Sequence, residues 1–316
     1  MKAARIHEFK GELRVDEVPE PQPGGGEVLA RIGYAAVNPL DIWVTQGTVG
    51  GGSQKLPFVP GTEATARVDG GWAFLLAPGY GTQRDGFYQE RVAVPRDAVV
   101  PLPPSVDPKQ AAAAGVAGIT AWRLVHDVAK LERGEEVLVL GASGGVGSIL
   151  IQVAKNAGAT IIAQTGNRDK ESWVREQGAD EVVVAEAAQL AESTAGRRLT
   201  AIFDPLGGTF TRAAADLLQP HGRLALFGVS AGAEATLDLR GLYRKGGSIL
   251  GYGGISEPPD RQRLALEHVL TEMAEGRIRV PIDEVLPLER AFEAHRRILA
   301  RQVRGKLVLE SGQAEA

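Results

Sequence analysis

The stretch "EEVLVLGASGGVGSILIQVAKNAGATIIAQTGNRDK", residues 135–170, decides the fold of this chain. A short apolar run at Val137–Leu140 leads into a glycine-rich turn at Gly141–Gly147 and a helix-like pattern at Ser148–Asn156, and a second apolar run follows. Small residues in such a turn let the backbone approach a pyrophosphate, whose charge is stabilised by the free N–H groups of a helix N-terminus. A tight strand-to-helix turn without a ligand is the alternative. The flanking strands and helix give the context that a dinucleotide site requires, so the stretch predicts one.

The rest of the chain extends this pattern in both directions. From Ala111 to about Glu257, short apolar runs alternate with helical patterns, which predicts a parallel sheet covered on both faces. Before Ala111 the chain reads as short strands separated by Gly and Pro, and it closes with a helix followed by a strand. A length of 316 residues exceeds the usual size of one hydrophobic core. We expect an α/β protein of two domains, in which the two end segments pack together around an inserted parallel-sheet domain.

The composition is that of an ordinary globular protein, with 44% hydrophobic and 23% charged residues. The net charge is −4, and Lys and Arg are dispersed, which argues against nucleic acid or a membrane surface as a partner. The first residues lack the apolar core of a signal peptide, and no apolar run reaches membrane-spanning length. We therefore expect a cytoplasmic protein that acts on a small molecule.

The chain offers little to a metal ion. It has no cysteine, so neither a thiolate nucleophile nor a cysteine-bound metal is possible. Its five histidines are scattered without the spacing of a metal site. We expect no metal.

The end of the second apolar run discriminates between cofactors. NAD sites usually carry an acid there, about 20 residues beyond the first glycine, to hold the ribose hydroxyls. Here the run ends in Gln164 and Thr165, and Arg168 and Lys170 lie just beyond it. Two cations would attract a 2′-phosphate, although a solvated basic turn is the alternative reading. The stretch favours NADPH.

At this point the chain resembles a known family. "VNPLD" (37–41), "VPGTEATARV" (59–68), "GITAWRLV" (118–125), "GASGGVG" (141–147) and "GKLVL" (305–309) occur in the order typical of the medium-chain dehydrogenase/reductase superfamily. The chain is most similar to the zinc-independent quinone oxidoreductase branch, which includes zeta-crystallin. The resemblance implies a GroES-like β-rich domain at 1–112 and 281–316, and a Rossmann NADP-binding domain, a doubly wound parallel sheet, at 113–280.

The resemblance also implies the site. In zinc-dependent members a Cys stands in the place of Asn38 and a His in the place of Thr62. Asn38 is then expected near the nicotinamide and the substrate carbonyl, with Trp43 as an aromatic wall; turn formation and core packing are the respective alternatives. These two are the candidate catalytic residues. The candidate cofactor-binding residues are Asn38, Thr120, Ser143, Gly144, Gly145, Val146, Gly166, Asn167, Arg168, Lys170, Phe227, Gly228, Val229, Ser230, Tyr252 and Arg304.

The implied reaction is metal-free hydride transfer from NADPH to a quinone or an α,β-unsaturated carbonyl. Enoyl-thioester reductases of the superfamily carry a Tyr near the position of Val49, and its absence here lowers that alternative without removing it. A non-catalytic NADPH-binding protein is a third reading. The superfamily often dimerises through its last Rossmann strand, so we expect a homodimer through residues 247–254.

Overall fold

The computed structural model describes residues 1–49, 52 and 54–312, so the last four residues of the predicted GroES-like segment lie outside the described residues. The chain divides into two compact units: unit 1 comprises Met1–Val116 and Leu266–Ala316, and unit 2 comprises Ala117–Ala265. No helix of the described part is long and apolar enough to cross a bilayer.

Unit 1 is built mainly from β-strands. Its strands are β1 (Lys2–Arg5), β2 (Arg14–Glu17), β3 (Glu27–Val37), β4 (Ala64–Val68), β5 (Gly71–Leu75), β6 (Arg91–Pro95), β7 (Val99–Pro101), β14 (Ile282–Pro287) and β15 (Lys306–Glu310). The helices α1 (Pro39–Thr45) and α9 (Ala291–Leu299) belong to this unit, whereas α2 (Pro108–Arg123) and α8 (Pro259–Ala274) cross its boundaries.

One sheet of unit 1 joins the two ends of the chain. Its strand order is β14-β15-β3-β4-β5-β7, and β6 also pairs with β3. β15 runs antiparallel to β3, with Leu307 opposite Val37. This pairing brings the start of β15 to the end of β3, where α1 begins. The buried apolar side chains of this unit form a core that includes Ile32 on β3, Leu307 on β15 and Phe87 in the loop before β6.

Unit 2 is a parallel α/β structure. Its strands are β8 (Glu136–Val139), β9 (Thr160–Thr165), β10 (Glu181–Val184), β11 (Leu199–Asp204), β12 (Arg223–Leu226) and β13 (Ser248–Gly251), and its helices are α3 (Gly145–Asn156), α4 (Glu171–Glu176), α5 (Leu190–Ser193), α6 (Gly208–Leu217) and α7 (Leu239–Arg244).

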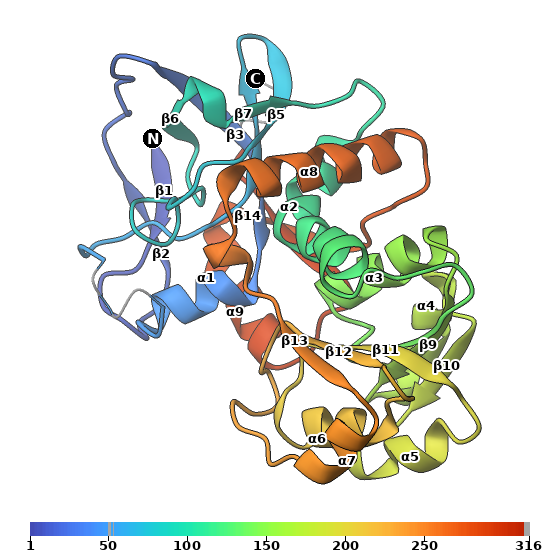
Figure 1. The fold of residues 1–316 in the computed structure, drawn as a ribbon. Helices are drawn as coiled ribbons and strands as arrows, with labels where there is room; N and C mark the ends of the chain where they lie inside the picture. The colour runs from blue at the N-terminus through green and yellow to red at the C-terminus, as the bar shows by residue number, and fades with distance from the viewer. Residues whose placement is uncertain (50–51, 53, 313–316) are drawn as a thin grey trace. The chain divides into compact units, whose positions relative to one another are not determined.

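The six strands lie in the order β10-β9-β8-β11-β12-β13, and every neighbouring pair is parallel. This is the doubly wound order of a dinucleotide-binding sheet, whose direction of winding reverses between β8 and β11. Figure 1 shows α3 and α4 on one face of this sheet and α5, α6 and α7 on the other. The predicted fold class, a β-rich domain with a doubly wound parallel-sheet domain, is confirmed.

The decisive stretch folds largely as its pattern predicts. β8 is buried over Val137, Leu138 and Val139, as expected of a strand covered on both faces. α3 ends at Asn156, and Gly158 adopts φ +90°, the left-handed conformation that commonly terminates a helix. The helix begins at Gly145, three residues before the predicted start. Glycine at 147 lets the first helical turn pack closely against the preceding loop.

Candidate active site

The turn between β8 and α3 brings backbone close to backbone. A Cβ atom on Gly147 would lie 2.7 Å from the Gly141 carbonyl oxygen and 2.8 Å from Ala142 Cα, so only glycine fits there. Gly144 is the N-cap residue of α3, and the predicted pyrophosphate residues Ser143 and Gly144 lie directly before the helix N-terminus. The next two, Gly145 and Val146, form the first helical turn. The free N–H groups of this turn suit a pyrophosphate.

Gln164 holds this turn in place. Its Oε1 accepts a hydrogen bond of 2.9 Å from the Gly141 N–H, and its Nε2 donates one of 2.7 Å to the Ala185 carbonyl oxygen. The side chain is only 2% exposed. The sequence identified Gln164 merely as a position without an acid. Its partners lie just beyond β8 and β10, so no local pattern could have revealed this role.

In the basic segment after β9, Gly166, Asn167 and Arg168 are exposed and Lys170 is half-buried. The Asn167 side chain accepts a hydrogen bond of 2.8 Å from the Asp169 N–H, which shapes the turn. Besides Asp169 in the turn itself, a second acid is nearby, since a Cβ on Gly166 would lie 3.3 Å from Oε1 of Glu186. Glu186 belongs to the segment after β10 and not to β9. The last residues of β9 therefore carry no carboxylate, and two cations, Arg168 and Lys170, follow β9.

Five further predicted residues of unit 2 lie directly after β12 and β13. The segment Phe227–Ser230 follows β12, where the Ser230 hydroxyl donates 3.2 Å to the Pro205 carbonyl oxygen and Val229 is 42% exposed. Tyr252 follows β13, and its N–H donates 2.9 Å to the Leu226 carbonyl oxygen. In open parallel sheets, ligands bind at these carboxyl ends.

Thr120 and Tyr252 come together although 132 positions separate them in sequence. Both side chains are 9% exposed, and Tyr252 interacts with both Arg123 and Thr120. Burial raises the pKa of Tyr252 to about 12; Glu257 adds to the rise, and Arg123 and Thr120 oppose it. The Tyr252 hydroxyl therefore stays protonated at neutral pH.

Asn38 lies at the centre of a buried polar cluster in unit 1. Its Nδ2 donates 2.8 Å to Glu63 Oε1, and its Oδ1 accepts 2.5 Å from the Lys306 ammonium. The same ammonium lies 2.9 Å from Glu63 Oε1 and 3.3 Å from the Val37 carbonyl oxygen. Asn38, Glu63 and Lys306 are 2%, 1% and 4% exposed. The motifs for Asn38 and Glu63 were recognised in the sequence, but the part played by Lys306 was missed.

A second acid, Asp41, holds the backbone of Asn38. Asp41 Oδ2 accepts 2.8 Å from the Asn38 N–H and 3.0 Å from the Tyr88 hydroxyl, and Oδ1 accepts 2.9 Å from the Thr62 hydroxyl. Burial raises the pKa of Asp41 to about 6, although these three hydrogen bonds oppose the rise. Asp41 therefore fixes the start of α1, which begins at the residue after Asn38.

The two remaining predicted residues of unit 1 lie at its surface. Trp43, on α1, is 37% exposed, which leaves part of its ring available to a ligand. Arg304 is exposed and stands two residues before Lys306 at the start of β15.

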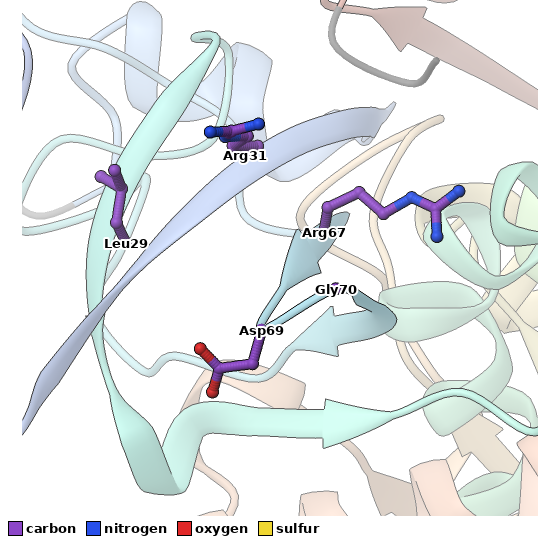
Figure 2. Close-up of a pocket in the computed structure, with 5 residues that line it drawn as sticks. All are labelled: Leu29, Arg31, Arg67, Asp69 and Gly70. Carbon is purple, nitrogen blue, oxygen red and sulfur yellow. The ribbon is translucent and has the colours of Figure 1, made fainter. Parts of the chain in front are cut away.

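A pocket on the unit 1 sheet contains none of these residues. It is lined by Leu29, Arg31, Arg67, Asp69 and Gly70, and Figure 2 shows the Asp69 carboxylate pointing away from the Arg67 guanidinium. Arg67 instead stacks over the Trp72 ring at 4.5 Å. The pocket adds nothing to the candidate site.

Comparison with known proteins agrees with the geometry. Residues 145–271 match the family described as zinc-binding dehydrogenase. A crystal structure of an NAD-dependent alcohol dehydrogenase is 30% identical with a TM-score of 0.89, and the match covers 99% of this chain and 100% of that one. The quinone oxidoreductase of Thermus thermophilus, solved also with NADPH, is 28% identical with a TM-score of 0.86 over 98% and 100% of the two chains. The quinone oxidoreductase of Sus scrofa is 29% identical over 98% and 97%.

The chain therefore belongs to the medium-chain dehydrogenase/reductase family of oxidoreductases. Within that family it is grouped with the quinone oxidoreductases, and the resemblance seen in the sequence motifs is confirmed.

The family description implies zinc, but the residues of unit 1 do not fit that metal. Asn38 and Thr62 offer neither thiolate nor imidazole, the donors that zinc prefers. The Lys306 ammonium already lies 2.5 Å from Asn38 Oδ1 and 2.9 Å from Glu63 Oε1, where it would repel a divalent cation. Within residues 1–49, 52 and 54–312, no three His, Cys, Asp or Glu side chains gather as metal ligands.

Proposed function

We propose that this protein is an NADPH-dependent reductase that transfers hydride to a quinone or an α,β-unsaturated carbonyl. The observation that carries the proposal is the glycine turn between β8 and α3, followed by a basic turn after β9. A relative crystallised with NADPH supports the same cofactor. Reduction of an acceptor that is already electron-poor needs no Lewis acid, which agrees with the donor chemistry of unit 1.

Different residues of unit 2 would bind the pyrophosphate, the 2′-phosphate and the nicotinamide of the cofactor. Ser143, Gly144, Gly145 and Val146 would hold the pyrophosphate at the N-terminus of α3. Arg168 and Lys170 would pair with the 2′-phosphate, with Gly166 and Asn167 shaping their turn. The remaining residues would border the nicotinamide, namely Thr120, Phe227, Gly228, Val229, Ser230 and Tyr252.

Two residues of unit 1 are proposed to contact the acceptor. We assign Asn38 to the acceptor carbonyl oxygen and Trp43 to its apolar body, with Arg304 reaching the cofactor. When bound, NADPH would supply a hydride to the acceptor, and one proton from solvent would complete the reduction. The protein then contributes orientation, exclusion of water and hydrogen bonds.

A homodimer is the proposed assembly. β13 is the last strand of the unit 2 sheet, with Ser248 and Gly251 exposed. A strand at the edge of a sheet is a template for pairing with a second copy.

The test of this function is NADPH oxidation, followed at saturating cofactor with a panel of quinones, enones and enoyl thioesters. Turnover of quinones or enones is the expected result. Turnover confined to enoyl thioesters would replace the proposal with the biosynthetic enoyl reductase. Tight NADPH binding without turnover of any acceptor would identify a non-catalytic binding protein.

A further inference from the structure

Lys306 is a buried cation with a full set of acceptors. Its ammonium lies 2.5 Å from Asn38 Oδ1, 2.9 Å from Glu63 Oε1 and 3.3 Å from the Val37 carbonyl oxygen. An ammonium has three N–H bonds, so these oxygens use all of them. The side chain is 4% exposed, and Lys is almost never buried to this extent unless it is paired.

The same contacts fix the orientation of the Asn38 amide. A cation beside Oδ1 and a carboxylate beside Nδ2 both oppose a flip of the amide, because the flip would place N–H against ammonium and oxygen against carboxylate. An amide nitrogen has two N–H bonds, and Glu63 takes only one of them. Asn38 is therefore held so that its remaining N–H is its available donor.

The Glu63 carboxylate is itself held from a second side. Its Oε2 accepts a hydrogen bond of 2.5 Å from the Val116 N–H of α2. The close approach needs Gly115, since a Cβ there would lie 2.5 Å from Glu63 Oε2 and 2.3 Å from the Phe74 ring. The acceptor of the Asn38 amide is thus rigidly placed before any ligand binds.

We propose that Lys306 is the positioning residue of the candidate active site. Its ammonium stands between Asn38 and Glu63 in place of a divalent cation, and it orients the Asn38 amide so that one N–H is directed to the carbonyl oxygen of the acceptor. The assignment of Asn38 to the acceptor rests on the proposed function, whereas the orientation of its amide does not.

A single substitution of Lys306 confounds orientation with charge. Lys306→Met removes the ammonium and leaves the Glu63 carboxylate buried without its counter-ion, which is strongly destabilising. The double variant Lys306→Met with Glu63→Gln removes both charges at nearly constant volume and is expected to regain most of the lost stability. In the double variant the amide introduced at position 63 can donate to Asn38 Oδ1 as well as accept from Nδ2, so the orientation of Asn38 is no longer fixed.

Turnover is measured for the wild type, the double variant and a control. The control is Lys2→Met, because Lys2 also pairs with a glutamate in unit 1 (Glu289, 2.7 Å) but is 47% exposed. We expect the double variant to lose up to about a hundredfold in kcat with the best acceptor, as for a misplaced active-site group, while its Kd for NADPH stays unchanged. A double variant that folds and turns over like the wild type would overturn the proposal, because Lys306 would then only balance charge.

A second readout does not depend on turnover. The chain has three asparagines, Asn38, Asn156 and Asn167, so selective ¹⁵N-Asn labelling yields three side-chain amide pairs. We expect the Asn38 pair to be sharp and slowly exchanging with water in the wild type, and shifted or broadened in the double variant. An unchanged Asn38 pair in a folded double variant would contradict the positioning role. If no acceptor is turned over by the wild type, the proposed function fails alone, and the amide signals still decide the role of Lys306.

Discussion

The Tyr88 hydroxyl donates a hydrogen bond of 3.0 Å to Asp41 Oδ2, and both side chains are fully buried. The bond links the N-terminus of α1 to the interior of unit 1. Burial raises the pKa of Asp41 to about 6, so this carboxyl is ionised at neutral pH and becomes protonated on mild acidification. The strength of the Tyr88 bond therefore depends on pH.

The first prediction is that Tyr88→Phe destabilises unit 1 more at neutral than at acid pH. At a pH of about 7.5 the bond is made to a carboxylate, and its loss is expected to cost about 2 kcal/mol in the free energy of unfolding. At a pH of about 5 the bond is made to a neutral acid, and the expected loss is about 1 kcal/mol. Urea denaturation at the two pH values measures both.

Tyr80→Phe is the matched control for this prediction. Tyr80 is also buried, and its hydroxyl donates 2.9 Å to a neutral acceptor, the Ala93 carbonyl oxygen. Its loss should be the same at both pH values. Equal losses at both pH values for Tyr88→Phe would contradict the assignment of the ionised partner.

The second prediction concerns the buried imidazole of His295 and the pH dependence of stability. It is 4% exposed, its ring meets the Tyr88 ring edge to face at 5.9 Å, and burial lowers its pKa to about 4. In the unfolded chain His295 becomes protonated as the pH falls below 6.5, whereas in the folded protein it stays neutral until the pH approaches about 4. The stability contributed by the neutral ring is therefore complete above pH 6.5 and is lost as the pH falls toward 4.

Replacement of His295 by Phe should remove this loss of stability at acid pH. Between pH 6.5 and about 4 the wild type is expected to lose about 3 kcal/mol more than the variant. Parallel pH profiles for wild type and His295→Phe, measured by thermal unfolding, would rule out a neutral buried imidazole.

The parts of this protein that sequence alone predicts are those carried by local pattern. The strand–turn–helix at 135–156 is encoded by adjacent residues, and the basic turn at Arg168 and Lys170 follows directly from its place after β9. The packing of the turn could not be predicted from local pattern, because Gln164 bonds to residues that follow two other strands.

The buried cluster was beyond local reasoning for the same reason. Lys306 stands in a short apolar run, "GKLVL", where a lysine predicts only a solvated strand end. Its partners, Asn38 and Glu63, are 268 and 243 positions away in sequence. Only the antiparallel pairing of β15 with β3 places the ammonium beside them.

Cofactor preference gives the third prediction. Replacing both Arg168 and Lys170 with Ala should weaken NADPH binding about ten- to hundredfold, because charge-assisted hydrogen bonds to the 2′-phosphate are lost. NADH lacks that phosphate, so its Kd should change little. Fluorescence titration of both cofactors measures the two constants.

The control for this pair removes two charges elsewhere on unit 2. Arg197 and Arg198 are exposed in the segment before β11, and their double replacement with Ala should leave both constants unchanged. Equal weakening of NADPH and NADH by the Arg168 and Lys170 variant would refute the 2′-phosphate assignment.

The last prediction concerns the proposed homodimer and the exposed side chains of α7. α7 ends shortly before this edge strand and exposes Leu239 and Tyr243, which are 69% and 68% accessible. Large exposed apolar side chains close in sequence to an edge strand are expected to be covered in a homodimer. The double variant Leu239→Glu with Tyr243→Glu should place like charges across the two-fold axis and yield a monomer in sedimentation equilibrium. Leu299→Glu, on α9 of unit 1 and 58% exposed at the wild-type residue, should remain dimeric. A wild-type protein that sediments as a monomer at micromolar concentration would contradict the proposed homodimer.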